Sequence, residues 1–148
     1  MARVRLELPA NFHFSINIPV RITDINYGGH VGNDSILSIL HEARMQFFKS
    51  FDYTEMQFAG TGLIMSDVII EFKNELFYGD NIIASVTAGE FTQVSFEIFY
   101  KLETLRESNR SLIAIAKTGM VCFDYKNKKI VAIPDEARIR LQSSADSQ

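Results

Sequence analysis

The sequence predicts an α+β fold in which one long helix packs against one antiparallel sheet. Residues 12–22 alternate strictly between apolar and polar side chains, which is typical of a half-buried strand. A helical repeat of apolar side chains follows in residues 36–51, and four further extended segments come after it. Because helices and strands do not alternate along the chain, an antiparallel sheet is expected rather than a parallel one.

The first predicted strand ends near Asp24, where the alternation of residues 12–22 stops. Pro19 lies inside this strand and has no N–H to donate to a neighbouring strand. We therefore expect an edge position or a bulge at Pro19.

The predicted helix follows a glycine-rich loop and has Asn33, Asp34 or Ser35 available as its N-cap. Its apolar stripe is broad enough to be covered by a sheet rather than by water. The stripe consists of Ile36, Leu37, Ile39, Leu40, Ala43, Phe47 and Phe51.

The rest of the chain is mostly extended, and its consecutive strands are expected to pair antiparallel through short turns. Apolar residues on both sides of the last strand suggest a partner subunit. A short helix opening at Pro134 and a disordered tail over residues 142–148 are expected to end a single domain whose core spans about residues 12–141. The predicted segments are a short helical turn (54–60), strands (63–72, 81–91, 93–102 and 111–123) and turns (78–80, 90–92 and 106–110).

Composition fits one domain of 148 residues, since 47% of the residues are hydrophobic. The net charge is −3 and the fifteen Lys and Arg residues are scattered, so a nucleic-acid partner is not expected. Cys122 is the only cysteine, which excludes an intrachain disulfide and favours an inert buried thiol in a cytoplasmic protein. No apolar run approaches the about 20 residues that span a bilayer, and MARVRLELPANF lacks the apolar block of a signal peptide, so we expect a soluble, unprocessed chain without a membrane partner.

Residues 23–34 concentrate the groups that could carry chemistry, with Asp24, Asn26, His30 and three glycines ahead of the helix. Bare glycine backbone lets a carbonyl oxygen approach closely, and the first N–H groups of a helix stabilise an oxyanion. A polar side chain opposite would direct water or act as a base. The structural alternative is a tight turn built by Asn26 and the glycines, with Asp34 capping the helix.

This segment resembles the hotdog family of acyl-CoA thioesterases, in the branch that contains 4-hydroxybenzoyl-CoA thioesterase. The resemblance rests on Asp24-Ile25-Asn26, on the glycine-rich stretch that follows, and on Glu42-Ala43-Arg44 in the helix. Residues 71–80 and 133–136 also resemble the family, so the likeness covers about residues 20–141.

The resemblance implies a five-stranded antiparallel sheet wrapped around the long helix, and hydrolysis of an acyl-CoA or acyl-carrier-protein thioester to free acid and thiol. It implies no cofactor, and a homodimer or homotetramer with sites between subunits. The family's catalytic carboxylate is the second Asp of Asp-x-Asp, and here that position is Asn26. An amide is not a general base near neutral pH, so Asp24, Asp67 or Glu42 is expected to replace it, unless the protein only binds its thioester.

The remaining candidate residues lie in the loop, in a predicted strand and elsewhere in the chain. Asn26 and His30 would position the thioester carbonyl or the water. Asp67 stands out because it interrupts an apolar strand, where a carboxylate is costly unless it is paired, solvated or functional. His13 and His41 are expected to be surface or packing residues, and no histidine pair has metal-ligand spacing, so no metal site is expected. The expected substrate-binding residues are Tyr27, Gly28, Gly29, Gly32 and Asn33.

Two other functions stay open at this point. The hydratase branch of the hotdog fold has an Asp-x-Asn-Pro-x-His arrangement, from which this sequence departs because Tyr27 replaces the proline and His30 comes one residue late. The second alternative is a non-catalytic domain that binds or senses acyl-CoA.

Overall fold

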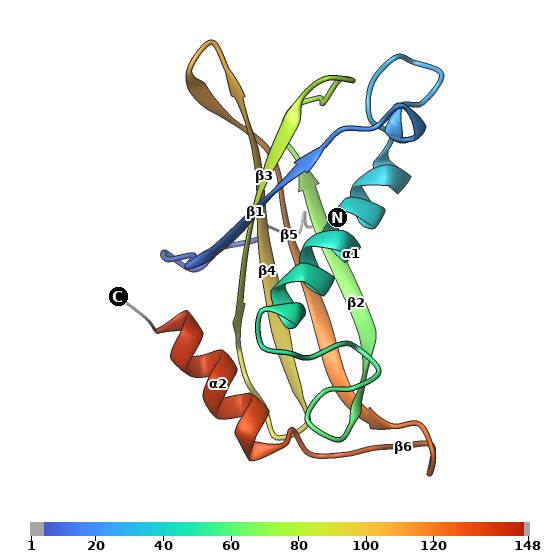
Figure 1. Ribbon diagram of the computed structural model, residues 1–148, viewed down its shortest axis with the longest axis vertical. Coiled ribbons are helices and arrows are strands. Elements are labelled where there is room, and N and C mark those ends of the chain that lie inside the picture. Colours follow the sequence, from blue (N-terminus) through green and yellow to red (C-terminus); the bar gives the residue numbers. More distant parts are fainter. Residues whose placement is uncertain (1–4, 147–148) are drawn as a thin grey trace.

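A computed structural model, which describes residues 5–146, contains one antiparallel sheet and two α-helices (Figure 1). The sheet order is β1-β3-β4-β5-β2, and a short sixth strand pairs with β5. The predicted α+β hotdog class is confirmed, although the sequence predicted five strands. The elements are β1 (Phe14–Pro19), a 3-10 turn η1 (Ile22–Asp24), α1 (Asn33–Lys49), β2 (Gly62–Phe72), β3 (Asn81–Gly89), β4 (Ser95–Arg106), β5 (Asn109–Asp124), β6 (Lys129–Ile130) and α2 (Asp135–Ala145).

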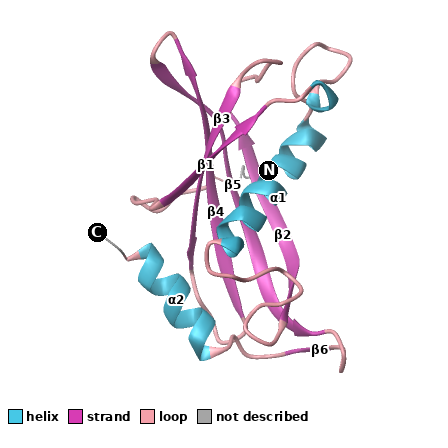
Figure 2. Cartoon of the chain, viewed as in Figure 1, coloured by secondary structure: helices cyan, strands magenta, loops and turns pink. Residues whose placement is uncertain are grey.

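The core lies between α1 and the sheet, which curves around the helix (Figure 2). The predicted apolar stripe is buried in α1 apart from Leu37, which is exposed, while Phe51 lies beyond the end of the helix and is half-buried. Phe47, Phe48 and Phe58 are almost fully buried and pack with Phe96 of β4 in an aromatic cluster. These phenylalanines are therefore core residues that fix α1 on the sheet.

Strand β1 lies at one edge of the sheet, where Pro19 faces Asn81 of β3 and needs no second ladder partner. The predicted edge position of Pro19 is confirmed. The strand does not reach residue 22, because the Asp24 carboxylate accepts a hydrogen bond from the Arg21 N–H at 2.8 Å and closes the η1 turn.

Strands β3, β4 and β5 pair consecutively as predicted, but β2 pairs with β5 rather than with β3. The connection between β2 and β3 forms hydrogen bonds with β5 and with the loop before α1. Its Lys73 N–H donates to the Ile113 carbonyl, and its Leu76 carbonyl accepts from the Val31 N–H at 2.8 Å. This connection therefore crosses the end of the sheet and lies against the loop before α1.

Two predictions about the helix start and the loop after the helix are wrong, and a third, about the tail, follows below. The N-cap of α1 is Gly32, which has an extended backbone and no capping side chain, and not a residue from 33–35. Residues 54–60 form no helical turn, because a bridge between Phe58 and Thr61 closes a loop there.

The tail is helical through Ala145 rather than disordered from residue 142, because Ala137 and Leu141 bury one face of α2. The Arg140 Nη1 donates to the Phe51 carbonyl at 2.8 Å and ties the helix to the core. Two parts of these predictions lie outside the described residues. They are residues 147–148 of the predicted tail and residues 1–4 of the N-terminal stretch that was considered as a signal peptide.

The outer face of the sheet is partly covered by residues 5–12 of the same chain. The Leu6 N–H donates to a Glu71 carboxylate oxygen of β2 at 2.7 Å, and the Lys101 ammonium lies 5.1 Å from the centre of the Phe12 ring. Part of the apolar surface that suggested a partner subunit is thus covered from within the chain. Neither α1 nor α2 is long and apolar enough to cross a membrane.

Candidate functional site

The glycine-rich segment forms a closed loop directly before α1. A bridge between Ile25 and Val31 joins its two ends, and the Asn26 N–H donates to the His30 carbonyl at 2.9 Å. Gly29 has φ +86°, a left-handed conformation that favours glycine. The loop and the β2–β3 connection lie at the same end of the molecule, the upper end in Figure 1.

Asn26 and His30 converge on the backbone of Gly28. The Asn26 Oδ1 accepts a hydrogen bond from the Gly28 N–H at 2.9 Å, which leaves the Asn26 Nδ2 free to donate. A Cβ on Gly28 would lie 3.2 Å from the Asn26 Oδ1 and 3.5 Å from the His30 Nε2. The bare backbone of Gly28 thus allows the two polar side chains to come close together.

The hydrogen bond of His30 determines which ring nitrogen is open. The Nδ1 lies 3.2 Å from the Val31 carbonyl oxygen, which can only accept, so the Nδ1 carries the proton. The Nε2 then has a free lone pair in the neutral ring. It faces a pocket of about 250 Å³ lined by Asn33, Ile36, Asn74 and Glu75, among others.

The start of α1 forms another side of this site. Gly32, the N-cap, contributes no side chain, and no side chain caps the first turn of the helix. The first N–H groups of a helix have no acceptor within the helix itself, so at this end of α1 they remain available to a ligand. Such N–H groups attract a carbonyl oxygen that is gaining negative charge.

Asp24 is buried, with 5% of its surface exposed, and it fixes the base of the loop. Its carboxylate accepts from the Arg21 N–H and side chain, and its carbonyl accepts from the Gly32 N–H at 3.3 Å. Asp24 also lines a groove of about 620 Å³ between β1 and α1, together with Glu42. Glu42 is exposed and accepts a hydrogen bond from Gln46 at 2.8 Å.

Asp67 and Tyr27 lie apart from this convergence. Asp67 is an exposed residue at a bulge of β2, opposite Gly119, and it accepts from the Ser66 hydroxyl at 2.8 Å. It lines a separate cavity with Lys117 and not the pocket at His30. Tyr27 is fully exposed.

The structure therefore sorts the residues selected from the sequence into three places. The loop and helix start bring together Asn26, Gly28, Gly29, His30, Gly32 and Asn33, with Tyr27 at the loop surface. Asp24 and Glu42 face the neighbouring groove, and Asp67 lies on β2. The sequence reasoning missed Glu75, whose Oε1 lies 3.8 Å from the His30 Nε2. The sequence signals for Glu75 were its acidic side chain in the connection after a strand and its place in the stretch 71–80 that resembles the family.

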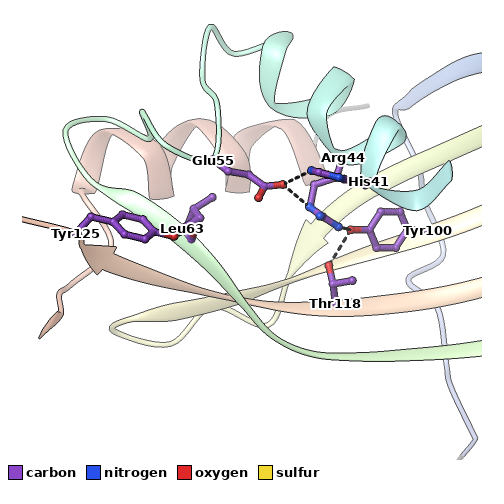
Figure 3. Close-up of polar contacts among 7 residues, drawn as sticks. All are labelled: His41, Arg44, Glu55, Leu63, Tyr100, Thr118 and Tyr125. Atoms are coloured by element: carbon purple, nitrogen blue, oxygen red, sulfur yellow. Dashed lines mark hydrogen bonds and ion pairs between the residues drawn. The ribbon is translucent and has the colours of Figure 1, made fainter. Parts of the chain in front are cut away.

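Arg44 turns from α1 into the interior, unlike the exposed Glu42 of the same motif (Figure 3). Its Nε donates to the Glu55 carboxylate at 2.8 Å, and its Nη1 donates to the Tyr100 hydroxyl at 3.1 Å. The Tyr100 hydroxyl also pairs with the Thr118 hydroxyl at 2.7 Å. Burial raises the pKa of Tyr100, which keeps the phenol neutral. This network fastens α1 to β4, β5 and the loop after the helix.

Two other candidates for chemistry take no part in the site. Burial raises the pKa of the Cys122 thiol to about 11, so it is a core residue and not a nucleophile near neutral pH. His41 is exposed, with its Nε2 3.3 Å from the Glu55 carboxylate. No cluster of metal-ligating side chains occurs within residues 5–146.

Comparisons of the sequence and of the structure with known proteins all find thioesterases or esterases. A family model described as the thioesterase-like superfamily matches residues 20–141. A "putative esterase" of Aquifex aeolicus is 29% identical over 79% of this chain and 88% of its own length. A "1,4-dihydroxy-2-naphthoyl-CoA hydrolase" of Rippkaea orientalis is 26% identical over 87% of this chain and 95% of its own length. A thioesterase-superfamily structure from Jannaschia superposes with a TM-score of 0.81 at 18% identity, covering 93% of this chain and 86% of that one.

Proposed function

The chain belongs to the thioesterase-like superfamily, and on that premise we propose that it hydrolyses an acyl-CoA thioester at the loop before α1. The observation that carries this proposal is the convergence of Asn26 and His30 on the bare backbone of Gly28. It joins a hydrogen-bond donor for a carbonyl oxygen with a base for water, at the uncapped start of a helix. These are the parts that thioester hydrolysis needs.

In the proposed mechanism the thioester carbonyl oxygen accepts from the Asn26 Nδ2 and from first-turn N–H groups of α1. The His30 Nε2 takes a proton from water as the water oxygen bonds to the carbonyl carbon. The tetrahedral intermediate then breaks its C–S bond, and the imidazolium returns the proton to the departing thiolate. Acyl thioester and water thus give acid and thiol, and the reaction needs no cofactor.

Asp24 enters this proposal as a residue that fixes the loop, since its carboxylate is already engaged by Arg21. Glu42 and Asp67 are the alternative bases. Both are exposed carboxylates, but each lines a cavity other than the pocket at His30. Their replacement by Gln and Asn is therefore part of the test below.

A compact acyl group is the proposed substrate. The pocket at His30 has a volume of about 250 Å³, and Ile36, Leu76 and Ile113 form its apolar walls. This space suits a ring or a short chain better than a long one. Two relatives are named as hydrolases of 1,4-dihydroxy-2-naphthoyl-CoA, whose acyl group is aromatic, which supports an aromatic acyl-CoA as the first substrate to test.

We also propose a homodimer formed through β2, with a homotetramer as its possible extension. Among residues 5–146, strand β2 pairs with β5 alone, so no described strand lies along its other side. Met65, Val68 and Phe72 are exposed along it, at 45%, 37% and 49%. A free apolar edge is a template for pairing with a second copy. Phe72 also borders the pocket at His30, so a partner on this edge would lie beside the site.

A cytoplasmic location completes the proposal, because the single buried thiol of Cys122 fits a reducing compartment.

The test is thiol release from a panel of aromatic, short-chain and long-chain acyl-CoA and acyl-carrier-protein thioesters. We expect release from aromatic or short acyl-CoA, and loss of that release in His30→Ala. Release that survives His30→Ala but disappears in Glu42→Gln or Asp67→Asn would move the base to that carboxylate.

The same experiment decides between the alternatives. Asn26 in place of the family carboxylate favours a binding or sensing domain as the second candidate. Saturable acyl-CoA binding without any thiol release would support that candidate and overturn the hydrolase. Formation of a 3-hydroxyacyl-CoA from an enoyl-CoA would favour the hydratase instead.

A further inference from the structure

We infer that Glu75 is a positioning residue for His30 and supplies from the β2–β3 connection the carboxylate that position 26 lacks. The inference rests on the proposed function, because it concerns the proton that His30 takes from water. Glu75 would stabilise the imidazolium that forms in that step.

The distance between the two groups suits this role. The Glu75 Oε1 lies 3.8 Å from the His30 Nε2, the nitrogen left open by the hydrogen bond between Nδ1 and the Val31 carbonyl. At 3.8 Å a neutral ring gains little from the carboxylate, since the distance is too long for a hydrogen bond. A protonated ring is attracted to it. The interaction therefore strengthens as the proton arrives, which is what lowers a barrier rather than merely improving binding.

The backbone of Glu75 is fixed relative to His30. The next residue, Leu76, is buried, and its carbonyl accepts from the Val31 N–H at 2.8 Å. The Glu75 carbonyl itself accepts from the Arg106 Nη2 at 2.7 Å. On the other side, the Asn74 Nδ2 donates to the Leu112 carbonyl at 2.7 Å. The carboxylate thus projects from a braced segment, although its side chain is 62% exposed.

Glu75 is the one carboxylate among the described residues that line the pocket at His30. The other charged side chain there is Lys73, whose ammonium lies 3.3 Å from the Glu71 carboxylate of β2. The remaining polar side chains of the pocket, Asn33 and Asn74, are neutral. Glu75 is therefore the negative charge in this pocket that would interact with a protonated His30. The Lys73 ammonium pairs with Glu71 instead.

The test compares Glu75→Gln with Glu136→Gln, which makes the same change at an exposed glutamate of α2. Because solvent weakens the pairing at an exposed carboxylate, we expect kcat for Glu75→Gln to fall roughly tenfold, with KM within about twofold of the parent. A fall in kcat at nearly constant KM is expected of a group that acts in the chemical step rather than in substrate binding. Glu136→Gln should match the parent in both measurements.

A double variant shows whether Glu75 acts through His30. Adding Glu75→Gln to His30→Ala should cost no further activity, because the base that the carboxylate serves is already gone. Unchanged kcat in Glu75→Gln would overturn the inference while an active parent leaves the proposed function intact. A fall in kcat that is additive with His30→Ala would also overturn it by indicating a structural role. A parent protein without thiol release would overturn both.

Discussion

The side chain of Asn26 presents a hydrogen-bond donor to the proposed site. Its Oδ1 is occupied by the Gly28 N–H, so the group it offers to a substrate is the Nδ2 donor. A carboxylate at this position would accept the same Gly28 hydrogen bond but would offer a second acceptor in place of the donor. In the proposed site Asn26 therefore binds the developing oxyanion, and the proton transfer passes to His30.

Replacing Asn26 by Asp tests this assignment directly. The loop should keep its shape, because the Gly28 N–H still finds an acceptor. The new negative charge would oppose the oxyanion, so we expect kcat to fall roughly 100-fold, the size of effect seen when one oxyanion donor is lost. Steady-state thiol release gives the measurement. A rise in kcat would show instead that this position works best as the family's catalytic acid.

Loss of the Arg44 side chain should lower the stability of the fold. Replacing Arg44 by Ala leaves the Glu55 carboxylate and the buried Tyr100 hydroxyl without their shared donor. Because the Glu55 carboxylate is only partly buried and His41 also lies beside it, we expect less than the cost of breaking a fully buried pair, a decrease of about 1–3 kcal/mol in the free energy of unfolding. Urea denaturation measures it, with Arg110→Ala, at an exposed ion pair, as the control. Equal losses for both variants would contradict the structural role of Arg44.

Sequence reasoning located the loop because its residue types are unusual together. A carboxylate, an imidazole, amides and glycines before a helix have few other uses, and Asn26, Gly28 and His30 do converge. It did not find Glu75, because Glu75 reaches His30 only through the hydrogen bond between Val31 and Leu76, a contact between distant parts of the chain. It also could not tell that Arg44 faces inward while Glu42 faces the groove.

Among the elements, β2 has the clearest unassigned surface. Its outer edge has no strand beside it in the described chain, and Val68 lies midway along the exposed stretch. A lysine at an edge strand opposes pairing with another strand. We therefore expect Val68→Lys to convert the proposed dimer to a monomer, as measured by sedimentation. Ile139→Lys, at an exposed position of α2, should leave the dimer unchanged. A parent protein that sediments as a monomer would contradict the proposed interface.

The elements themselves were largely predictable because local periodicity determines them. The apolar stripe of α1 and the alternation in β1 and β4 are visible in the sequence, and the turn before β3 contains Gly79 at φ +97°. The pairing of β2 with β5 was not predictable in this way. It depends on where the β2–β3 connection finds its hydrogen bonds, and those partners are remote in sequence.

At the scale of the whole molecule, the fold brings two stretches that are remote in sequence to one end. The loop before α1, the start of α1 and the β2–β3 connection meet there, and each contributes polar groups to one pocket. The buried network at Arg44 and the aromatic cluster keep α1 seated on the sheet, so the helix start keeps its place relative to the loop. The site is thus a product of the architecture as well as of the loop sequence.

The most direct test of this account is thiol release by His30→Ala beside His13→Ala, which removes an exposed histidine outside the site. With an acyl-CoA that the parent hydrolyses, the account predicts a fall in kcat of roughly 100-fold or more for His30→Ala, the contribution expected of a general base, and parent activity for His13→Ala. Equal thiol release by both variants would contradict the claim that the loop before α1 carries the chemistry.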